Sequence, residues 1–226
     1  MERPYRIGVL GGTGAQGSGL ALRLALAGHE LVVGSRDGAR AASVAAQLSA
    51  RAGRTIAGSE NRAAATAAEI VILTVPYAVQ RATVAHVLDQ LDGKVLVDST
   101  VPLVPPKVGT VQLPGGESAV AAIQRLAGEK VRVVSAFQNV SAQHLCELDH
   151  EVDCDVLVCG DNRAACYLVI ALCADMGMRA LHAGPLANSA AAEALTSVLI
   201  TINRRYKVAG AGIRITGLPG SGARGG

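Results

Sequence analysis

Leu10-Gly11-Gly12-Thr13-Gly14-Ala15-Gln16-Gly17 is the most informative stretch of the chain. It follows an apolar, strand-like run at 5–10 and leads into an alanine-rich helical stretch. Gly12, Gly14 and Gly17 fit the pattern G-x-G-x-x-G, whose glycines allow a tight turn, a close approach of the backbone to a pyrophosphate, and close packing of helix on strand. Free amides at the start of the helix then face the phosphates. The stretch therefore predicts dinucleotide binding rather than an ordinary glycine-rich turn.

The end of the second predicted strand, Leu31-Val32-Val33-Gly34-Ser35-Arg36, indicates which dinucleotide is bound. NAD-binding domains usually carry here an Asp or Glu that binds the adenine ribose hydroxyls, and this stretch has neither. A hydroxyl and a guanidinium suit a ribose phosphate instead. Thr13 adds another hydroxyl, and Arg40 lies one helical turn beyond Arg36. We therefore expect the dinucleotide to be NADP. The alternative interpretation of Ser35 is that it caps the helix that follows.

Along the rest of the chain, apolar β-type runs alternate with alanine-rich helical stretches, which is typical of βαβ units. The predicted strands are 5–10, 30–34, 55–58, 70–75, 94–98, 132–136, 155–159 and 179–183. The clearest predicted helices are 15–27, 37–52, 79–91 and 163–175. Right-handed crossovers place the C-terminal end of every strand at one edge of the sheet. Five loops are expected to converge there, at 11–17, 35–36, 76–77, 99–102 and 137–140.

We predict an α/β fold, a Rossmann-type doubly wound parallel sheet with a small helical C-terminal subdomain. The NADP-binding Rossmann domain covers 1–183, because Gly184-Pro185 breaks the pattern. The subdomain covers 184–216 and contains one long helix at 188–206. The glycine-rich residues 217–226 are expected to be a disordered tail. One side of the long helix is apolar and predicts a homodimer, through Ala191, Leu195, Val198, Leu199 and Ile202.

Composition argues against several other classes of protein. The 226 residues carry a formal charge of +3, one Phe and no Trp, which argues against nucleic-acid binding. No apolar run reaches the roughly 18 residues that a membrane span needs. The five cysteines include no C-x-x-C pair, and the histidines lack metal-like spacing. Met1–Tyr5 shows no signal peptide. We therefore expect reduced thiols, no metal and a cytoplasmic location.

Several further motifs give the chain a resemblance to a known family, from Ile7 to about Ile215. They are Leu10–Gly14, Gly28-His29-Glu30, Val33–Arg36, Thr74-Val75-Pro76, Val158–Asp161, Ala183–Leu186, Asn203–Lys207 and Gly212–Ile215. In these motifs the chain resembles the NADPH-dependent reductases of coenzyme F420, an 8-hydroxy-5-deazaflavin. The stretch from Asn203 to Ile215 is the most diagnostic, because a generic Rossmann protein has no reason to carry it.

The resemblance implies a set of cofactor-binding residues. It places NADP contacts at Thr13, Gly14, Ala15, Gln16, Ser35, Arg36, Arg40, Val79 and Ala142. It places the deazaflavin against the nicotinamide, near Pro102, Leu103, Gln138, Val140, Ala211 and Gly212. Thr74 belongs to the same predicted cofactor-binding set, and the small aliphatic loops at Val75-Pro76, Val101-Pro102 and Val140 are expected to press flat surfaces on the rings. The chain departs from the family at Gln138, where His is frequent, and Gln cannot carry a charge.

The expected activity is reversible hydride transfer between NADP(H) and coenzyme F420 as co-substrate. The two cofactors bring the chemistry, so we expect no catalytic acid, base or covalent nucleophile from the protein. Gln138 is expected to orient a ring carbonyl. Two alternative functions stay open, because they need the same glycine loop and the same Ser35-Arg36 pair as the expected activity. One is an NADPH-dependent reductase of an imine, flavin or quinone-like acceptor, and the other is a non-catalytic NADPH-binding redox sensor.

Overall fold

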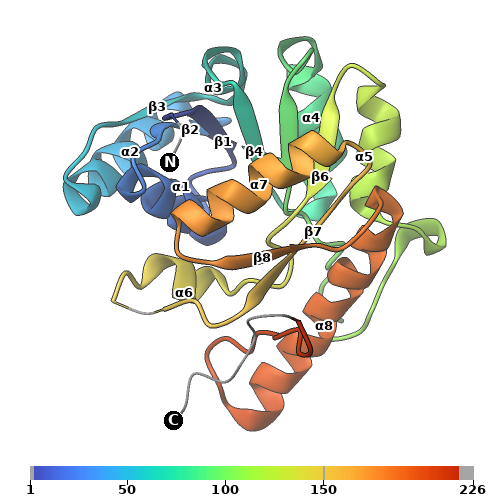
Figure 1. Ribbon diagram of the computed structural model, residues 1–226. Coiled ribbons are helices and arrows are strands. Elements are labelled where there is room, and N and C mark those ends of the chain that lie inside the picture. Colours follow the sequence, from blue (N-terminus) through green and yellow to red (C-terminus); the bar gives the residue numbers. More distant parts are fainter. Residues whose placement is uncertain (1–2, 150, 219–226) are drawn as a thin grey trace.

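The computed structural model describes residues 3–149 and 151–218 (Figure 1). Eight strands form one sheet in the order β3-β2-β1-β4-β5-β6-β7-β8. The strands are β1 Arg6–Leu10, β2 Glu30–Ser35, β3 Ile56–Glu60, β4 Ile70–Leu73, β5 Val95–Asp98, β6 Arg132–Ser135, β7 Asp155–Gly160 and β8 Arg179–His182. The helices are α1 Ala15–Leu26, α2 Gly38–Ala52, α3 Asn61–Ala67, α4 Tyr77–Val87, α5 Ala119–Ala127, α6 Ala142–Cys146, α7 Arg163–Asp175 and α8 Ser189–Tyr206, with 3-10 turns at Leu88–Gln90, Pro114–Gly116 and Leu186–Asn188. All eight predicted strands are therefore present.

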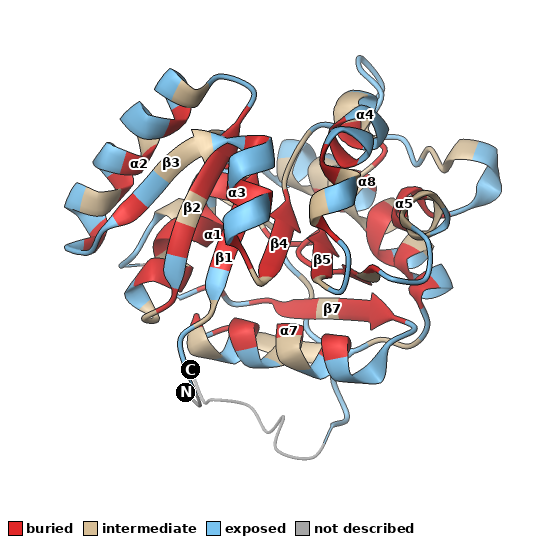
Figure 2. Ribbon diagram, turned by 90° about the horizontal axis from the view of Figure 1, so that it is seen from above, coloured by how far each residue is buried: buried red, intermediate tan, exposed pale blue. Residues whose placement is uncertain are grey.

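Helices cover both faces of the sheet, and each face has its own apolar core (Figure 2). One core joins α1, α2 and α7 to Ile7 and Val9 of β1. The other joins α3, α4 and α5 to Leu73 of β4 and Leu96 of β5. Successive strand residues point to opposite faces, so a strand rich in Ile, Val and Leu serves both cores. This arrangement confirms the doubly wound α/β class that the sequence predicts.

The prediction that every strand ends at the same edge is wrong for the last two strands. β7 pairs antiparallel with β6, through Val134 with Gly160 and Ser135 with Cys159, and β8 runs parallel to β7. The chain after β6 does not cross back over the sheet. It stays at the edge and forms the short α6, which Arg23 of α1 holds by hydrogen bonds to backbone carbonyls. β7 therefore begins at the edge where β1, β2, β4, β5 and β6 end.

α8 is attached to the sheet layers through a buried carboxylate. The Glu193 side chain is 1% exposed and accepts hydrogen bonds from Ser118 Oγ at 2.6 Å and from the backbone amides of Ala119 and Val120 at 2.8 and 3.2 Å. These amides belong to the start of α5, where a helix leaves its first amides unpaired. Glu193 of α8 thus accepts the hydrogen bonds that the first amides of α5 cannot make within their own helix.

The chain after α8 returns to the sheet. The amide of Asp155 donates to the carbonyl of Ile213 at 2.8 Å, and the amide of Ile215 donates to Asp155 Oδ2 at 2.6 Å. This return segment therefore lies beside the start of β7. Most of the tail predicted at 217–226, namely residues 219–226, lies outside the described residues. Within the described ranges, none of the helices combines the length and apolar character needed to cross a membrane.

Candidate active site

The loop between β1 and α1 has the geometry that the glycine pattern predicts. A Cβ on Gly12 would lie 2.7 Å from the carbonyl oxygen of Val9, and a Cβ on Gly17 would lie 2.5 Å from Thr74 Oγ1, so a side chain fits at neither position. Gly14 is exposed and begins α1 in an extended conformation without a side-chain cap. The first amides of α1 are therefore available to a phosphate.

A cavity of about 300 Å³ opens beside the ends of β2 and β3. Its walls are formed by Ser35, Arg36, Glu60, Asn61, Val79, Ala82, Thr83 and His86. Ser35 is buried, whereas Arg36 and Arg40 are exposed, and neither guanidinium has an ion pair or hydrogen bond with another described residue. A hydroxyl and an unpaired guanidinium beside one cavity can bind a phosphate. Of the predicted residues, the structure brings Ser35, Arg36 and Val79 to this cavity.

Sequence reasoning missed four polar residues of this cavity, Glu60, Asn61, Thr83 and His86. Glu60 lies opposite Ser35 in the parallel register of β2 and β3, so the pairing of neighbouring strand ends could have indicated it. His86 depends on the rotation of α4, which only the structure gives. The cap of α2 also differs from the alternative interpretation of Ser35. Asp37 is the cap, and its side chain accepts from the amide of Arg40 at 3.1 Å.

The five predicted loops lie at the C-terminal ends of the parallel strands β2, β1, β4, β5 and β6. Thr74 joins two of these loops, because its amide and its Oγ1 both donate to the carbonyl of Leu10, at 2.9 and 3.0 Å. Val75 and Pro76 follow Thr74 at the start of α4. A Cβ on Gly11 would lie 2.6 Å from the Val75 side chain, so the glycine loop and the loop after β4 are in close contact.

A buried carboxylate joins the loops after β4, β5 and β6. Asp98 has no exposed surface, and it accepts from Gln80 Nε2 of α4 at 2.6 Å and from the amide of Thr100 at 2.9 Å. Its backbone carbonyl accepts from Gln138 Nε2 at 2.8 Å. Burial raises the pKa of the Asp98 carboxyl, and the hydrogen bonds from Thr100 and Gln80 act against that rise. Asp98 therefore serves to hold these three loops in position, since its carboxyl does not reach the surface.

The turn after β6 contains two of the predicted residues, Gln138 and Val140, both buried. The amide nitrogen of Gln138 is engaged by Asp98, while its Oε1 is buried without a partner in the described chain. Of the predicted residues after β5, Pro102 is buried and Leu103 is half-buried. Ala142 is the first residue of α6, which begins just beyond the turn.

The predicted C-terminal residues Ala211 and Gly212 lie in the return segment after α8. The amide of Ala211 donates to Asn203 Oδ1 at 2.7 Å, and a Cβ on Gly212 would lie 2.4 Å from the Cβ of Cys154. Cys154 directly precedes β7, which begins at the same edge of the sheet as the five loops. The antiparallel direction of β7 therefore brings this segment to the predicted edge.

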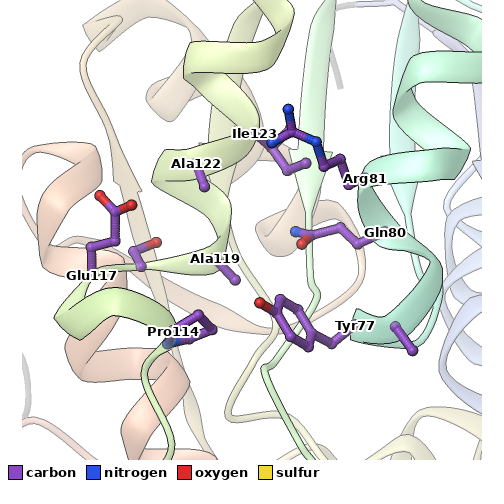
Figure 3. A pocket seen from close by; sticks show the side chains of 10 residues that line it. Tyr77, Gln80, Arg81, Pro114, Glu117, Ala119, Ala122 and Ile123 are labelled. Atoms are coloured by element: carbon purple, nitrogen blue, oxygen red, sulfur yellow. The ribbon is translucent and has the colours of Figure 1, made fainter.

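A second cavity, also about 300 Å³, lies between α4 and α5 (Figure 3). Tyr77, Gln80 and Arg81 reach it from α4, and the wall on α5 is apolar, with Ala119, Ala122 and Ile123. Sequence reasoning did not find it, because its two walls come from separate helices. Its link to the first site is Gln80, whose amide nitrogen binds Asp98.

The thiols are poor candidates for nucleophilic catalysis. All five cysteines are unpaired, and four of them are buried. Burial raises the pKa of Cys154 and of Cys159 to about 11 and raises the pKa of Cys173 further. A thiol with a raised pKa stays protonated and unreactive at neutral pH. Among the described residues there is also no group of three or more His, Cys, Asp or Glu side chains suited to a metal ion.

The fold and the glycine loop define a dinucleotide-binding protein of the Rossmann class. Residues 6–102 match the model of a family described as NADP oxidoreductase, coenzyme F420-dependent. The chain is 42% identical to the F420-dependent NADP reductase of Methanothermobacter thermautotrophicus over 222 residues, which cover 95% of this chain and 96% of that protein. It is 40% identical to the enzyme of the same description from Methanocaldococcus jannaschii, over 94% of this chain and 99% of the other.

A crystal structure from Arthrobacter sp. FB24, described as that of an F420-dependent NADP reductase, superposes with a TM-score of 0.79 at 25% identity, over 94% of this chain and 99% of that one. The agreement extends over both the sheet and the C-terminal region. The chain belongs to the family of F420-dependent NADP reductases, which confirms the resemblance seen in its motifs.

Proposed function

We propose that this protein catalyses reversible hydride transfer between NADP(H) and coenzyme F420. The observation that carries the NADP half is the cavity at the end of β2, where the Ser35 hydroxyl and the unpaired Arg36 guanidinium stand in place of the acid expected for NAD. Membership of the family supports the deazaflavin as the second substrate. Both molecules are substrates that bind and leave.

The dinucleotide binds across the edge where the five loops meet. Thr13, Gly14, Ala15 and Gln16 bind the pyrophosphate at the start of α1. Ser35, Arg36 and Arg40 bind the ribose phosphate, and the adenine occupies the cavity against Val79. The nicotinamide then lies over the loops of Thr74, Val75 and Pro76, towards Ala142. The pyrophosphate and the ribose phosphate, the two anionic groups of NADP, thus lie at the start of α1 and at Ser35-Arg36, where the protein offers free hydrogen-bond donors.

The deazaflavin stacks on the nicotinamide, near Pro102, Leu103, Gln138, Val140, Ala211 and Gly212. Hydride leaves carbon 4 of the nicotinamide and bonds to carbon 5 of the deazaflavin, while one proton from solvent completes the reduced ring. Each ring carries the hydride on a carbon atom in its reduced form and accepts it there in its oxidised form, so the protein supplies alignment and excludes water. The raised thiol pKa values and the enclosed Asp98 are in keeping with this mechanism, which requires no acid, base or nucleophile.

The proposed function goes with a two-domain chain that forms a homodimer in the cytoplasm. The chain divides into an NADP-binding domain, residues 1–183, and a small C-terminal subdomain, residues 184–216. Two copies pair through α8, where Val198 is 44% exposed although Leu199 beside it is buried in the protomer. The unpaired thiols suit a reducing cytoplasm.

Absorbance spectroscopy tests the proposed activity. Purified protein is mixed with oxidised deazaflavin and either NADPH or NADH, and the visible absorbance of the deazaflavin is followed. We expect rapid bleaching with NADPH and bleaching at least about tenfold slower with NADH, because only NADPH offers Arg36 a charged partner. No bleaching, together with reduction of a flavin, imine or quinone by NADPH, would assign another acceptor. NADPH binding without reduction of any acceptor would instead indicate a sensor.

A further inference from the structure

The turn after β6 contains a strained backbone position within the site. Phe137 has φ +73°, in the left-handed region, where bulky side chains are rarely found. Its side chain is the only phenylalanine of the protein and is 1% exposed, so the ring is anchored in the core while the backbone is strained. Such strain persists only where the surroundings hold the backbone firmly, and it is concentrated at functional sites.

Four elements hold this turn by side-chain hydrogen bonds. Gln138 donates to the carbonyl of Asp98 of β5 at 2.8 Å, and Asn139 donates to the carbonyl of Asp155 of β7 at 2.7 Å. Thr196 of α8 donates to the carbonyl of Gln138, also at 2.8 Å. The fourth bond comes from α1, where Gln16 Nε2 donates to the carbonyl of Phe137 at 3.0 Å.

The bond from Gln16 differs from the other three, because Gln16 belongs to the glycine loop. The bond connects a residue of the predicted dinucleotide site to the strained peptide of Phe137, which lies 121 residues further along the chain. The carbonyl it binds, that of Phe137, also accepts from the amide of Val140 at 3.2 Å, which closes the turn. The Gln16 side chain therefore braces the turn, while its backbone amide stays at the start of α1.

We propose that Gln16 is a positioning residue for the second substrate: its side chain holds the strained turn 137–140 in the shape that receives the deazaflavin. This inference rests on the proposed function, which places the deazaflavin against that turn. It gives Gln16 a second role beyond the pyrophosphate contact expected from its place in the glycine loop. The two substrate sites are then joined by one hydrogen bond.

The test separates the two substrates in Gln16→Met, which keeps the length of the side chain and removes the donor. NADPH affinity is measured by fluorescence titration, and deazaflavin kinetics by absorbance. We expect the dissociation constant of NADPH to change less than about twofold, because the backbone amides remain. We expect kcat/KM for the deazaflavin to fall roughly tenfold, the size expected for loss of one buried hydrogen bond. Thr13→Val, which removes a hydroxyl from the same loop and leaves the Gln16 bond intact, should instead raise the dissociation constant of NADPH.

Hydrogen exchange gives a readout that does not depend on turnover. Amides of the peptide covering 137–140 should exchange faster in Gln16→Met, while those of β1 and α2 keep the wild-type rates. Weaker NADPH binding with unchanged deazaflavin kinetics and unchanged exchange would overturn the inference, as would no change at all. If wild-type protein does not reduce the deazaflavin, the proposed function fails, and the exchange experiment alone then decides whether Gln16 holds the turn.

Discussion

Arg36 and Ser35 show at the scale of single residues how the cofactor choice is built. The buried hydroxyl and the exposed guanidinium lie at one cavity, and the guanidinium has no carboxylate partner among the described residues. Both residues could be predicted from the sequence, because adjacent residues at a strand end share a site. Thr83 and His86 could not, because they reach the same cavity from α4, whose rotation about its axis is given only by the structure.

Replacing Arg36 with Ala should raise the Michaelis constant for NADPH at least about tenfold and leave that for NADH nearly unchanged. A hydrogen bond to a charged group is worth about 1.5–3 kcal/mol, and only NADPH carries the ribose phosphate. Steady-state kinetics with both dinucleotides measures the difference. Arg54→Ala, an exposed arginine outside the cavity, is the control and should resemble wild type. Equal losses for NADPH and NADH in Arg36→Ala would show that Arg36 does not read the phosphate.

At the scale of elements, the sequence predicts which segments are strands better than it predicts their direction. Alternating apolar and alanine-rich segments place all eight strands. The reversal of β7 was missed because it depends on α6, which has only five residues and stays at the edge beside α1. Arg23 stabilises that position through backbone carbonyls, and such carbonyls leave no signature in the sequence. The start of β7 and the return segment consequently join the predicted site edge.

The attachment of α8 to α5 through Glu193 predicts a large loss of stability on truncation. Glu193→Ala leaves the buried amides of Ala119 and Val120 without their acceptor, and each such donor costs about 1–3 kcal/mol. We expect the free energy of unfolding in urea to fall by at least about 2 kcal/mol. Glu129→Ala, at an exposed position near the end of α5, should change it by less than about 0.5 kcal/mol. A similarly small change for Glu193→Ala would mean that water or another group replaces the carboxylate.

His29 links three elements and predicts how stability depends on pH. Its side chain is buried, its Nδ1 accepts from the amide of Tyr5 at 3.2 Å, and its Nε2 lies 3.3 Å from Asp175 at the end of α7. Burial lowers the pKa of His29 below its ordinary value of 6.5, against the opposing attraction of Asp175. Between the lowered pKa and 6.5, the unfolded chain binds a proton that the folded chain does not. The contribution of His29 to stability is therefore complete above pH 6.5, declines below that value, and is lost once the pH has fallen through the lowered pKa of the folded protein.

His29→Asn isolates this effect, because Asn keeps an acceptor for the amide of Tyr5 but does not titrate. Urea unfolding at about pH 7.5 and about pH 5.5, on either side of the ordinary pKa of histidine, should show a smaller decline in the free energy of unfolding for the variant than for wild type. His182→Asn changes an exposed histidine and should keep the wild-type decline. An identical decline in His29→Asn would assign the pH dependence to other groups.

For the whole molecule, the apolar side of α8 predicts a dimer. Some of that side is used within the protomer, since Leu199 is buried, but Val198 remains 44% exposed. Light scattering at micromolar concentration should give the mass of two chains. Val198→Glu should give the mass of one chain with retained secondary structure, whereas Leu26→Glu, at a similarly exposed position on α1, should stay dimeric. A monomeric wild type would contradict the prediction and leave α8 as a cover over its own site.

Isotope tracing distinguishes direct transfer of hydride between two bound rings from exchange with solvent. NADPH carrying deuterium at carbon 4 is incubated with the protein and oxidised deazaflavin, and the reduced deazaflavin and the water are analysed by mass spectrometry. Direct transfer predicts deuterium at carbon 5 of the deazaflavin, with none washed out into solvent, since no protein group takes the hydride. Deuterium found in water, with an unlabelled reduced deazaflavin, would rule out direct transfer.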